Sequence, residues 1–254
     1  MKALSVVILT KNAQSTIGDA VRSAFLVSND VIVIDSGSTD DTLIIARQAG
    51  ASCFSIVWNG FGNARNQGAT LAQNDFILNI DADEIITGEL AQSINELEPQ
   101  PHSIYGFQRL NYLGEKAIRH GEWGNDRVWR IYNRTETQWN LLEVHETLHY
   151  DGLEKKMVKG MLKHFTAPDI RSFSQKMDGY AHLSAKKYFE QNKKIGFFKM
   201  KASPLFNIVK NYLFRLGILD GKEGWALAKA YYLYNRQKYR YLQQLKQKQP
   251  SAAG

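Results

Sequence analysis

The chain has almost no cysteine and lacks an uncharged apolar run long enough to cross a membrane. Cys53 is the single cysteine among 254 residues, so an internal disulfide is excluded and a reducing compartment is permitted. The apolar segment 205–219 is broken by Lys210, Asn211 and Arg215, and a span needs about 18 residues. The apolar run within 1–12 is short and strand-like, so we expect no signal peptide and a cytoplasmic protein.

Other absences narrow the chemistry. The sequence contains no internal repeats and no low-complexity segments, and its length suits one substantial domain with or without a long appendage. Neither a Ser-His-Asp set nor a cysteine nucleophile stands out. Residues 10–15, which follow the first apolar run, contain no glycine, and this argues against the glycine-rich phosphate loop of many nucleotidyltransferases.

Acidic residues are scarce in the second part of the chain. The net charge is +7, but residues 1–150 sum to −7 and residues 151–254 sum to +14. This asymmetry indicates an acidic catalytic or binding body and a basic part that faces an anionic surface. Nucleic acid and anionic lipid are the usual surfaces of this kind.

The first 80 residues alternate between apolar runs and amphipathic segments. The apolar runs predict four strands, at 4–10, 31–34, 52–58 and 76–80, with a helix between each pair. This pattern is typical of a parallel sheet, in which ligands bind at the carboxyl ends of the strands. Thr10, Asp35, Asp81 and Asp83 all fall at such ends, although Asp35 could equally be a residue that caps the following turn.

Three carboxylates follow the fourth predicted strand within four residues, in the sequence Asp81-Ala82-Asp83-Glu84. Like charges held together resist ionisation unless a cation balances them. Hard carboxylate oxygens suit Mg²⁺ or Mn²⁺, which in turn favours a phosphate-bearing ligand. The plainer interpretation is a strand followed by an acidic turn, with Glu84 only capping that turn.

The rest of the chain predicts a domain followed by helices. We expect a helix at 90–97 and strands at 104–113, 127–132, 142–149 and 158–164. A helical extension begins at Pro168, a further helix starts at Ser203-Pro204, and the last helix runs from Trp225 to about Leu245. The resulting units are a catalytic domain at 1–166, a basic helical extension at 167–248 and a disordered tail at 249–254.

Several of these segments together resemble the family 2 glycosyltransferases, which have the α/β GT-A fold with a mostly parallel central sheet. The resemblance rests on 5–12, on 33–42 and on Asp81-Ala82-Asp83-Glu84. Residues 60–66 and 144–146 are similar to a bacterial branch that contains lipopolysaccharide core β-glucosyltransferases of the WaaE type. The family likeness covers about residues 1–165.

The resemblance implies a donor site for a UDP-sugar. Thr10 and Asp35 would contact the uracil, and Arg65 would lie near the ribose or the diphosphate. Asp81 would contact the ribose or metal-bound water, while Asp83 would bind Mg²⁺ or Mn²⁺. The remaining implied residues are Glu146 as catalytic base, Arg130 as a cation near the departing diphosphate, and His164 as a further metal ligand or diphosphate contact.

Each of these residues also has a plainer interpretation. His145-Glu146 could be an exposed polar pair, and His164 could be a histidine that only makes a hydrogen bond. Arg127 and Arg130 could be surface charges of a strand. The pattern of residues does not decide between these alternatives.

The implied reaction is direct displacement with inversion at the anomeric carbon, from a UDP-sugar to a cell-envelope glycolipid such as lipopolysaccharide core. Glucose follows from the branch resemblance alone. The basic helices interleave Tyr, Trp and Phe with Lys and Arg, which favours peripheral attachment to the anionic inner leaflet. Nucleic acid is disfavoured as a partner because no nucleic-acid motif is present. The rivals are transfer to a protein or another polymer, or a membrane-associated scaffold without turnover.

Overall fold

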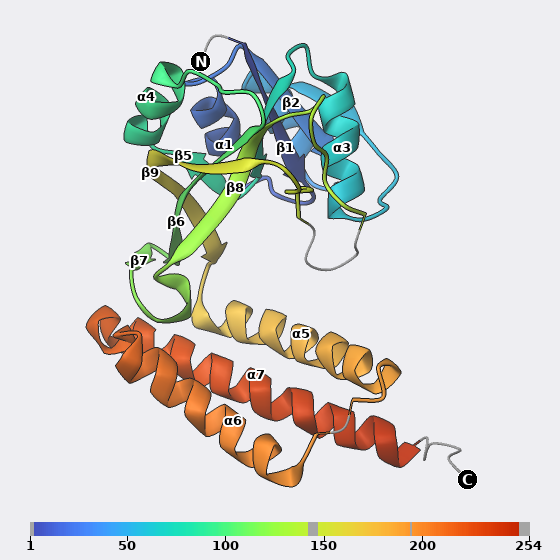
Figure 1. Cartoon of the computed structure of the whole chain (residues 1–254), viewed down its shortest axis with the longest axis vertical. Helices are drawn as coiled ribbons and strands as arrows, with labels where there is room; N and C mark the ends of the chain where they lie inside the picture. The colour runs from blue at the N-terminus through green and yellow to red at the C-terminus, as the bar shows by residue number, and fades with distance from the viewer. Residues whose placement is uncertain (1–2, 142–146, 194, 249–254) are drawn as a thin grey trace. The chain divides into compact units, whose positions relative to one another are not determined.

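The computed structural model describes residues 3–141, 147–193 and 195–248 (Figure 1). The chain divides into two compact units. The first, called here the sheet unit, comprises Met1–Arg109 and Asp126–His164. The second, called the helical unit, comprises Leu110–Asn125 and Phe165–Gly254. Each unit therefore contains two separate stretches of the sequence.

The first half of the sheet is parallel, as the sequence predicts. Its spatial order is β3-β2-β1-β4, and three helices connect the strands. The third strand ends earlier than expected, at Ser55. The elements are β1 Leu4–Thr10, α1 Ile17–Ala24, β2 Asp30–Asp35, α2 Thr42–Gln48, β3 Ser52–Ser55, α3 Phe61–Leu71 and β4 Phe76–Asp81.

The sheet continues beyond β4 with antiparallel strands, in the order β8-β6-β9-β5. The expected strand at 142–149 differs from the structure: residues 142–146 lie outside the described residues, and in 147–149 only Leu148 forms a bridge, with Trp139. The elements are β5 Glu84–Ile86, α4 Gly88–Glu96, β6 Ser103–Leu113, β7 Lys116–Ile118, the short helix η1 Gly121–Trp123, β8 Asp126–Asn133 and β9 Glu154–Ala167.

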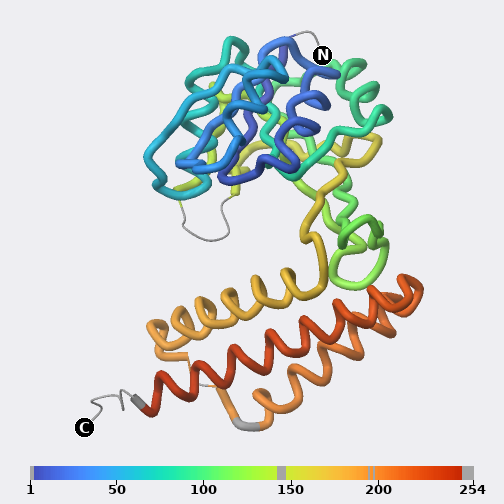
Figure 2. The backbone as a smooth tube through the Cα atoms, turned by 180° about the vertical axis from the view of Figure 1, so that it is seen from behind, coloured from blue at the N-terminus to red at the C-terminus, as the bar shows by residue number. Residues whose placement is uncertain are grey.

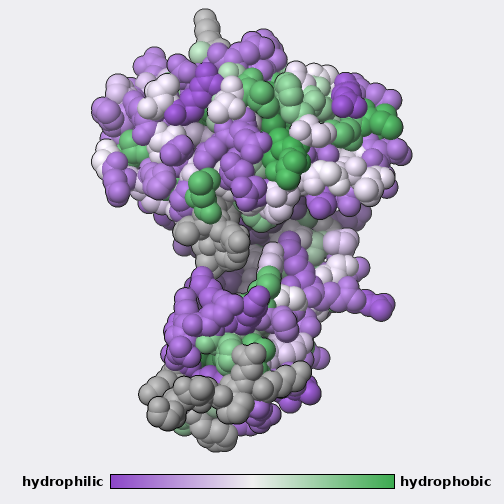
Figure 3. Space-filling model, turned by 90° about the vertical axis from the view of Figure 1, so that its right-hand side faces the viewer, coloured by the Kyte–Doolittle hydropathy of each residue, from purple (hydrophilic) through white to green (hydrophobic). Residues whose placement is uncertain are grey.

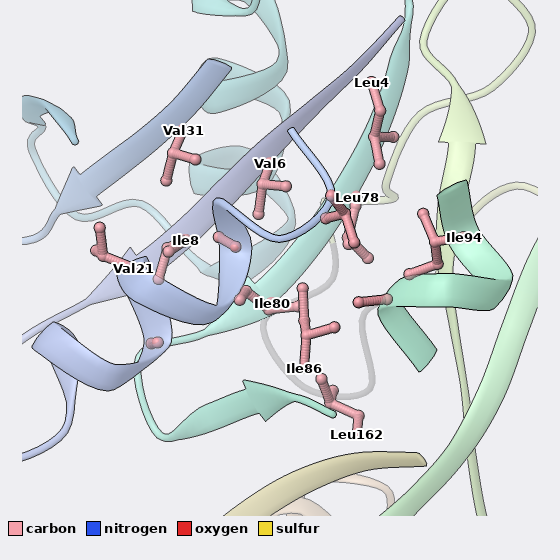
Figure 4. Close-up of a cluster of buried hydrophobic side chains, with 14 of the residues drawn as sticks. Leu4, Val6, Ile8, Val21, Val31, Leu78, Ile80, Ile86, Ile94 and Leu162 are labelled. Carbon is pink, nitrogen blue, oxygen red and sulfur yellow. The ribbon is translucent and has the colours of Figure 1, made fainter. Parts of the chain in front are cut away.

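Two apolar clusters hold the sheet unit together, because strand β1 is buried on both faces. Figure 4 shows one cluster, in which side chains of β1 and β4 meet α1, α4 and β5. The other cluster lies against α3, where Gly68 replaces a side chain: a Cβ at this position would lie 2.4 Å from Cγ1 of Val7. Close packing of α3 against the sheet thus depends on this glycine.

The helical unit is built mainly from three helices, α5 Ile170–Glu190, α6 Phe197–Val209 and α7 Gly221–Lys248. Figures 1 and 2 show α5 and α6 lying along α7. The prediction that a helix starts at Ser203-Pro204 is wrong, since Pro204 lies inside α6. The prediction that the last helix starts at Trp225 is also wrong, because α7 begins four residues earlier. The short turns η2 Lys210–Phe214 and η3 Gly217–Asp220 connect α6 to α7.

Aromatic residues of α7 pack within the helical unit. The Tyr231 hydroxyl accepts a hydrogen bond from Nε1 of Trp123 at 3.0 Å, and Tyr241 donates to the carboxylate of Asp178. Tyr239 is buried. In the described part of the chain, no helix combines the length and apolar character that crossing a bilayer requires.

Candidate active site

The sheet brings together three of the residues singled out in the sequence. Thr10, Asp35 and Asp81 are the last residues of β1, β2 and β4. In the strand register Thr10 is opposite Asp35, and Asp81 is opposite Leu9. The three side chains therefore originate at the same edge of the parallel half of the sheet, where α/β sheets bind ligands.

Asp35 is buried and holds the turn that follows its strand. Its carboxylate accepts hydrogen bonds from the backbone N–H groups of Gly37 at 3.1 Å and Ser38 at 3.0 Å. Gly37 has a φ of 95°, which a residue without a Cβ adopts freely. The Ser38 hydroxyl also donates to this carboxylate, at 2.5 Å. Because a carboxylate offers about four acceptor sites and three donor groups of the turn use it, capacity for one further donor is left.

Thr10 presents a buried polar atom at the same edge. Its Oγ1 has no hydrogen-bond partner among the residues that the structure describes. A buried hydroxyl without a partner costs free energy, about 1–3 kcal/mol, unless a ligand or water satisfies it. This side chain is thus suited to contact a polar ligand group.

Asp81 lies between two arginines from different elements. Arg65 of α3 donates from Nη2 to Oδ1 at 2.9 Å, and Arg130 of β8 donates from Nη2 to Oδ2 at 3.1 Å. Burial raises the pKa of the Asp81 carboxyl, but the positive charges of Arg130 and Arg65 outweigh it, so that the pKa lies well below its usual range. Asp81 is therefore an anion at neutral pH.

Glu84 is a charged residue of this site that the sequence analysis left as a turn cap. Its side chain is fully buried, and its carboxylate accepts from the backbone N–H of Asp81 at 2.8 Å and from Nη1 of Arg109 at 3.0 Å. Arg130 approaches the same carboxylate at 3.7 Å, and Arg109 also pairs with Asp126 at 2.8 Å. Three carboxylates and three guanidinium groups thus balance one another in the described part of this network.

Trp139 forms a wall of the site and was missed by the sequence analysis. The guanidinium carbon of Arg65 lies 4.5 Å from the centre of its ring, and that of Arg130 lies 5.8 Å away. Its Nε1 donates to Oδ1 of Asn79 at 2.7 Å, while Asn66 bonds its backbone at both N–H and carbonyl. Asn79, a polar residue inside the apolar strand 76–80, was the one sequence feature that indicated a buried hydrogen-bond partner such as Trp139.

Asp83 and His164, which the resemblance implies as metal ligands, lie together. Asp83 is in the turn between β4 and β5, and its Oδ2 is 3.4 Å from Nε2 of His164. Glu84 is opposite His164 in the β5–β9 register, which explains the approach. In the described ranges, no group of three or more His, Cys, Asp or Glu side chains is arranged to hold a metal ion.

Glu146, the implied catalytic base, lies outside the described residues. Thr147, which directly follows it in the chain, pairs with Asn140: the backbone N–H of Asn140 donates to the Thr147 carbonyl at 2.9 Å. Asn140 directly follows Trp139 in the chain. Its carbonyl oxygen packs closely on Gly62, because a Cβ at Gly62 would lie only 1.9 Å from that oxygen. Thr147, the first described residue after Glu146, therefore lies close to Trp139 through its pairing with Asn140.

Comparisons with known proteins identify the family of the chain. A profile described as "Glycosyl transferase family 2" matches residues 5–158, which is more than half of the chain. An uncharacterized glycosyltransferase of Rickettsia prowazekii is 27% identical over 239 residues, covering 89% of this chain and 81% of that protein. The lipopolysaccharide core biosynthesis glycosyltransferase LpsC of Rhizobium meliloti is 25% identical over 223 residues, covering 85% and 82%.

Among solved structures, the chain is similar to glucosyl-3-phosphoglycerate synthase from Mycobacterium tuberculosis, crystallised with Mn²⁺, UDP-glucose and phosphoglyceric acid. The sequence identity is 27% and the TM-score is 0.37; the match covers 43% of this chain and 44% of that one. The family match covers more than half of the chain and therefore shows its family. The chain belongs to glycosyl transferase family 2, as an α/β enzyme of the GT-A type.

Proposed function

We propose that this glycosyltransferase transfers a sugar, glucose by its branch resemblance, from a UDP-sugar to a cell-envelope glycolipid such as lipopolysaccharide core, with inversion. The observation that carries the proposal is the carboxyl edge of the sheet. There the buried Asp35 carboxylate can accept the N–H of uracil and the buried Thr10 hydroxyl can donate to a uracil oxygen, and Asp81 lies beside them with two arginines. The likeness to LpsC supports the acceptor class.

The charge balance of the site supports a divalent cation. Arg65, Arg109 and Arg130 already compensate Asp81, Glu84 and Asp126, so an incoming diphosphate needs additional positive charge. The Asp83 carboxylate suits Mn²⁺ or Mg²⁺ because these ions prefer hard oxygen donors. We propose the adjacent His164 imidazole as a further metal ligand or diphosphate contact. When bound, the ion would stabilise charge on the departing diphosphate.

Glu146 is the residue we propose as general base. A positioned carboxylate that takes the proton of the acceptor hydroxyl contributes typically about 10²–10⁴-fold to the rate. Support comes from the next residue in the chain, Thr147, which pairs with Asn140 beside Trp139. Glu146→Gln should retain UDP binding and lose transfer, measured as acceptor-dependent UDP release; unchanged turnover would remove Glu146 from this role.

The donor site is tested by isothermal titration of the purified protein with UDP and with GDP, each with and without Mn²⁺. We expect binding of UDP in preference to GDP, strengthened by Mn²⁺ in the wild type and insensitive to Mn²⁺ in Asp83→Ala. Exposed Asp75→Ala is the matched control, because Asp75 pairs only with surface Arg134 in the described structure. Absence of binding by either nucleotide would leave a family member without turnover as the better account.

We also propose that the enzyme works at the cytoplasmic face of the membrane, held there peripherally by the basic unit 167–248. The positive charge of residues 151–254 supports this location, since each basic residue near an anionic surface contributes about 1 kcal/mol. A lipid-linked acceptor is presented at such a surface. We further propose that residues 1–166 act as the catalytic domain and residues 167–248 as the basic extension that attaches it to the membrane.

A further inference from the structure

The helical unit exposes large apolar side chains on one helix and the turn that follows it. Phe198 is 83% exposed, Phe206 61% and Phe214 73%. Isolated exposed apolar residues are ordinary, but a contiguous group on one element marks an interaction surface. We call this group the α6 stripe; its members are Phe198, Leu205, Phe206, Val209, Leu213 and Phe214.

The spacing places the members within α6 on one side of that helix, and Leu213 and Phe214 follow in η2. Phe198, Leu205 and Val209 follow one another at intervals of seven and four residues, which in a helix brings them to the same face. Pro204 is buried and falls on another side of α6, and α6 packs along α7. The stripe is therefore a second apolar face of α6, separate from the one that its unit covers.

Basic residues border the stripe and acidic residues are missing from it. The 29 residues from 191 to 219 include no Asp or Glu and six Lys or Arg. By helical periodicity, Lys201 lies along one border of the stripe, and Lys199 and Lys210 lie along the other. Figure 3 shows green apolar residues on the surface of the helical unit among purple hydrophilic ones.

We propose that the α6 stripe docks on a lipid bilayer that contains anionic headgroups. Apolar side chains flanked by lysines match the boundary between acyl chains and headgroups, because the lysine stems lie on the apolar layer while their charges reach the phosphates. The absence of Asp and Glu from residues 191–219 limits repulsion from those phosphates. The inference rests on the proposed function in one respect, namely that the acceptor is a glycolipid.

This assignment is narrower than the one that the sequence pattern favours. The pattern points to the basic, aromatic helical extension 167–248 as a whole, but several tyrosines of its last helix, α7, make contacts inside the helical unit. Exposed apolar residues are also found on α5, η3 and α7, but the two with the largest exposed fractions in the described part of this unit are Phe198 on α6 and Phe214 on η2. The stripe is thus the part of the unit that exposes its apolar side chains most fully.

The test is sedimentation of the purified full-length protein with two kinds of vesicle, phosphatidylcholine alone and phosphatidylcholine mixed with phosphatidylglycerol. The stripe variant combines Leu205→Ser with Phe206→Ser. Its matched control combines Leu183→Ser with Tyr180→Ser on α5, where Leu183 is 58% exposed, as Leu205 is. A second pair of variants tests the lysines. The Lys199/Lys210 variant combines Lys199→Glu with Lys210→Glu, and its control combines Lys176→Glu with Lys187→Glu on α5, so that both variants change the net charge by the same amount.

We expect the wild type to bind the mixed vesicles, and to bind them less at high salt. The stripe variant and the Lys199/Lys210 variant should each lose about tenfold or more in vesicle partitioning, while both controls stay close to the wild type. Circular dichroism and UDP binding should be unchanged in all four variants. These results together would support the α6 stripe as the docking surface.

Three outcomes would overturn the inference. In the first, the wild type stays in the supernatant with both vesicle types. In the second, the stripe variant and its control lose vesicle binding equally. In the third, the wild type does not bind vesicles, and light scattering shows that it forms a dimer whereas the stripe variant is a monomer. The last result would assign the stripe to a second copy of the chain. If the protein binds UDP but does not bind vesicles, the docking proposal is wrong while the donor-site proposal still stands. The two proposals can therefore be tested independently.

Discussion

Glu84 is a fully buried carboxylate that contacts Arg109 and Arg130 and accepts the backbone N–H of Asp81. Removing one member of a buried charge group leaves its partners desolvated and costs about 3–5 kcal/mol. We expect Glu84→Gln to lower the free energy of unfolding by about 3 kcal/mol in urea titrations. Glu89→Gln is the control: Glu89 is 52% exposed and pairs with exposed Lys159 at 3.4 Å, so its loss should cost less than about 1 kcal/mol. Equal effects of the two substitutions would contradict the role of Glu84.

Asp81 makes the stability of the sheet unit depend on pH. Its pKa in the folded protein lies below the ordinary value of about 3.9, so its ionic contribution is complete above that pH and is lost as the pH falls further. The stability difference between wild type and Asp81→Asn should therefore be constant at neutral and mildly acidic pH and shrink below about pH 4. Urea unfolding of both proteins over this pH range measures the difference. A gap that widens with acid would show that the sign is wrong.

The site residues divide according to what a sequence can show. Thr10, Asp35 and Asp81 stand at strand ends, and strand ends are visible as the termination of apolar runs. Glu84 and Trp139 are different, because their partners come from distant strands and loops whose approach depends on the tertiary fold. The roles of the implied site residues stay predictions until they are measured.

At the scale of elements, two helical glycines allow a direct test of packing. A Cβ at Gly68 of α3 would meet Val7 at 2.4 Å and Ile34 at 2.9 Å, whereas a Cβ at Gly179 of α5 would meet nothing within 4 Å. Gly68→Ala should destabilise the protein by about 1–3 kcal/mol because α3 must move away from the sheet. Gly179→Ala should stabilise it by about 0.5–1 kcal/mol because alanine loses less backbone entropy in a helix.

Thermal or urea unfolding of both alanine variants provides the measurement. Opposite signs are the expected result. A stabilising Gly68→Ala would mean that α3 does not pack on β1 and β2 as described.

Elements of the parallel half could be predicted because each is a local pattern with its own boundaries. The antiparallel additions were only partly predictable: β6 and β8 were expected, but the three-residue strand β5 falls in the run that reads as an acidic turn. Pro204 misled the prediction of α6 in a physical way. Proline favours the first turn of a helix, yet α6 begins at Phe197 and carries Pro204 in its interior.

At the scale of the whole molecule, the two units should respond differently to a donor ligand. All described residues of the carboxyl-edge network belong to the sheet unit, so UDP with Mn²⁺ should slow hydrogen exchange there and leave α5 and α7 unchanged. A hundredfold excess over the dissociation constant stabilises a binding unit by about 2.7 kcal/mol. Exchange measured by mass spectrometry with and without the ligands tests this. Uniform protection of both units would contradict it.

The helical unit is assembled from two distant parts of the chain, and this limits how such an enzyme can be recombined. Residues 110–125 contribute Ile118 and Trp123 to the same apolar cluster as Phe173 and Leu227. A gene fusion that exchanges only the C-terminal part would leave Ile118 and Trp123 packed against apolar side chains from a different protein. Inheritance of new helices therefore requires a matched change in the middle of the gene, so that the C-terminal helices and the 110–125 insertion are expected to diversify together rather than shuffle as a simple C-terminal module.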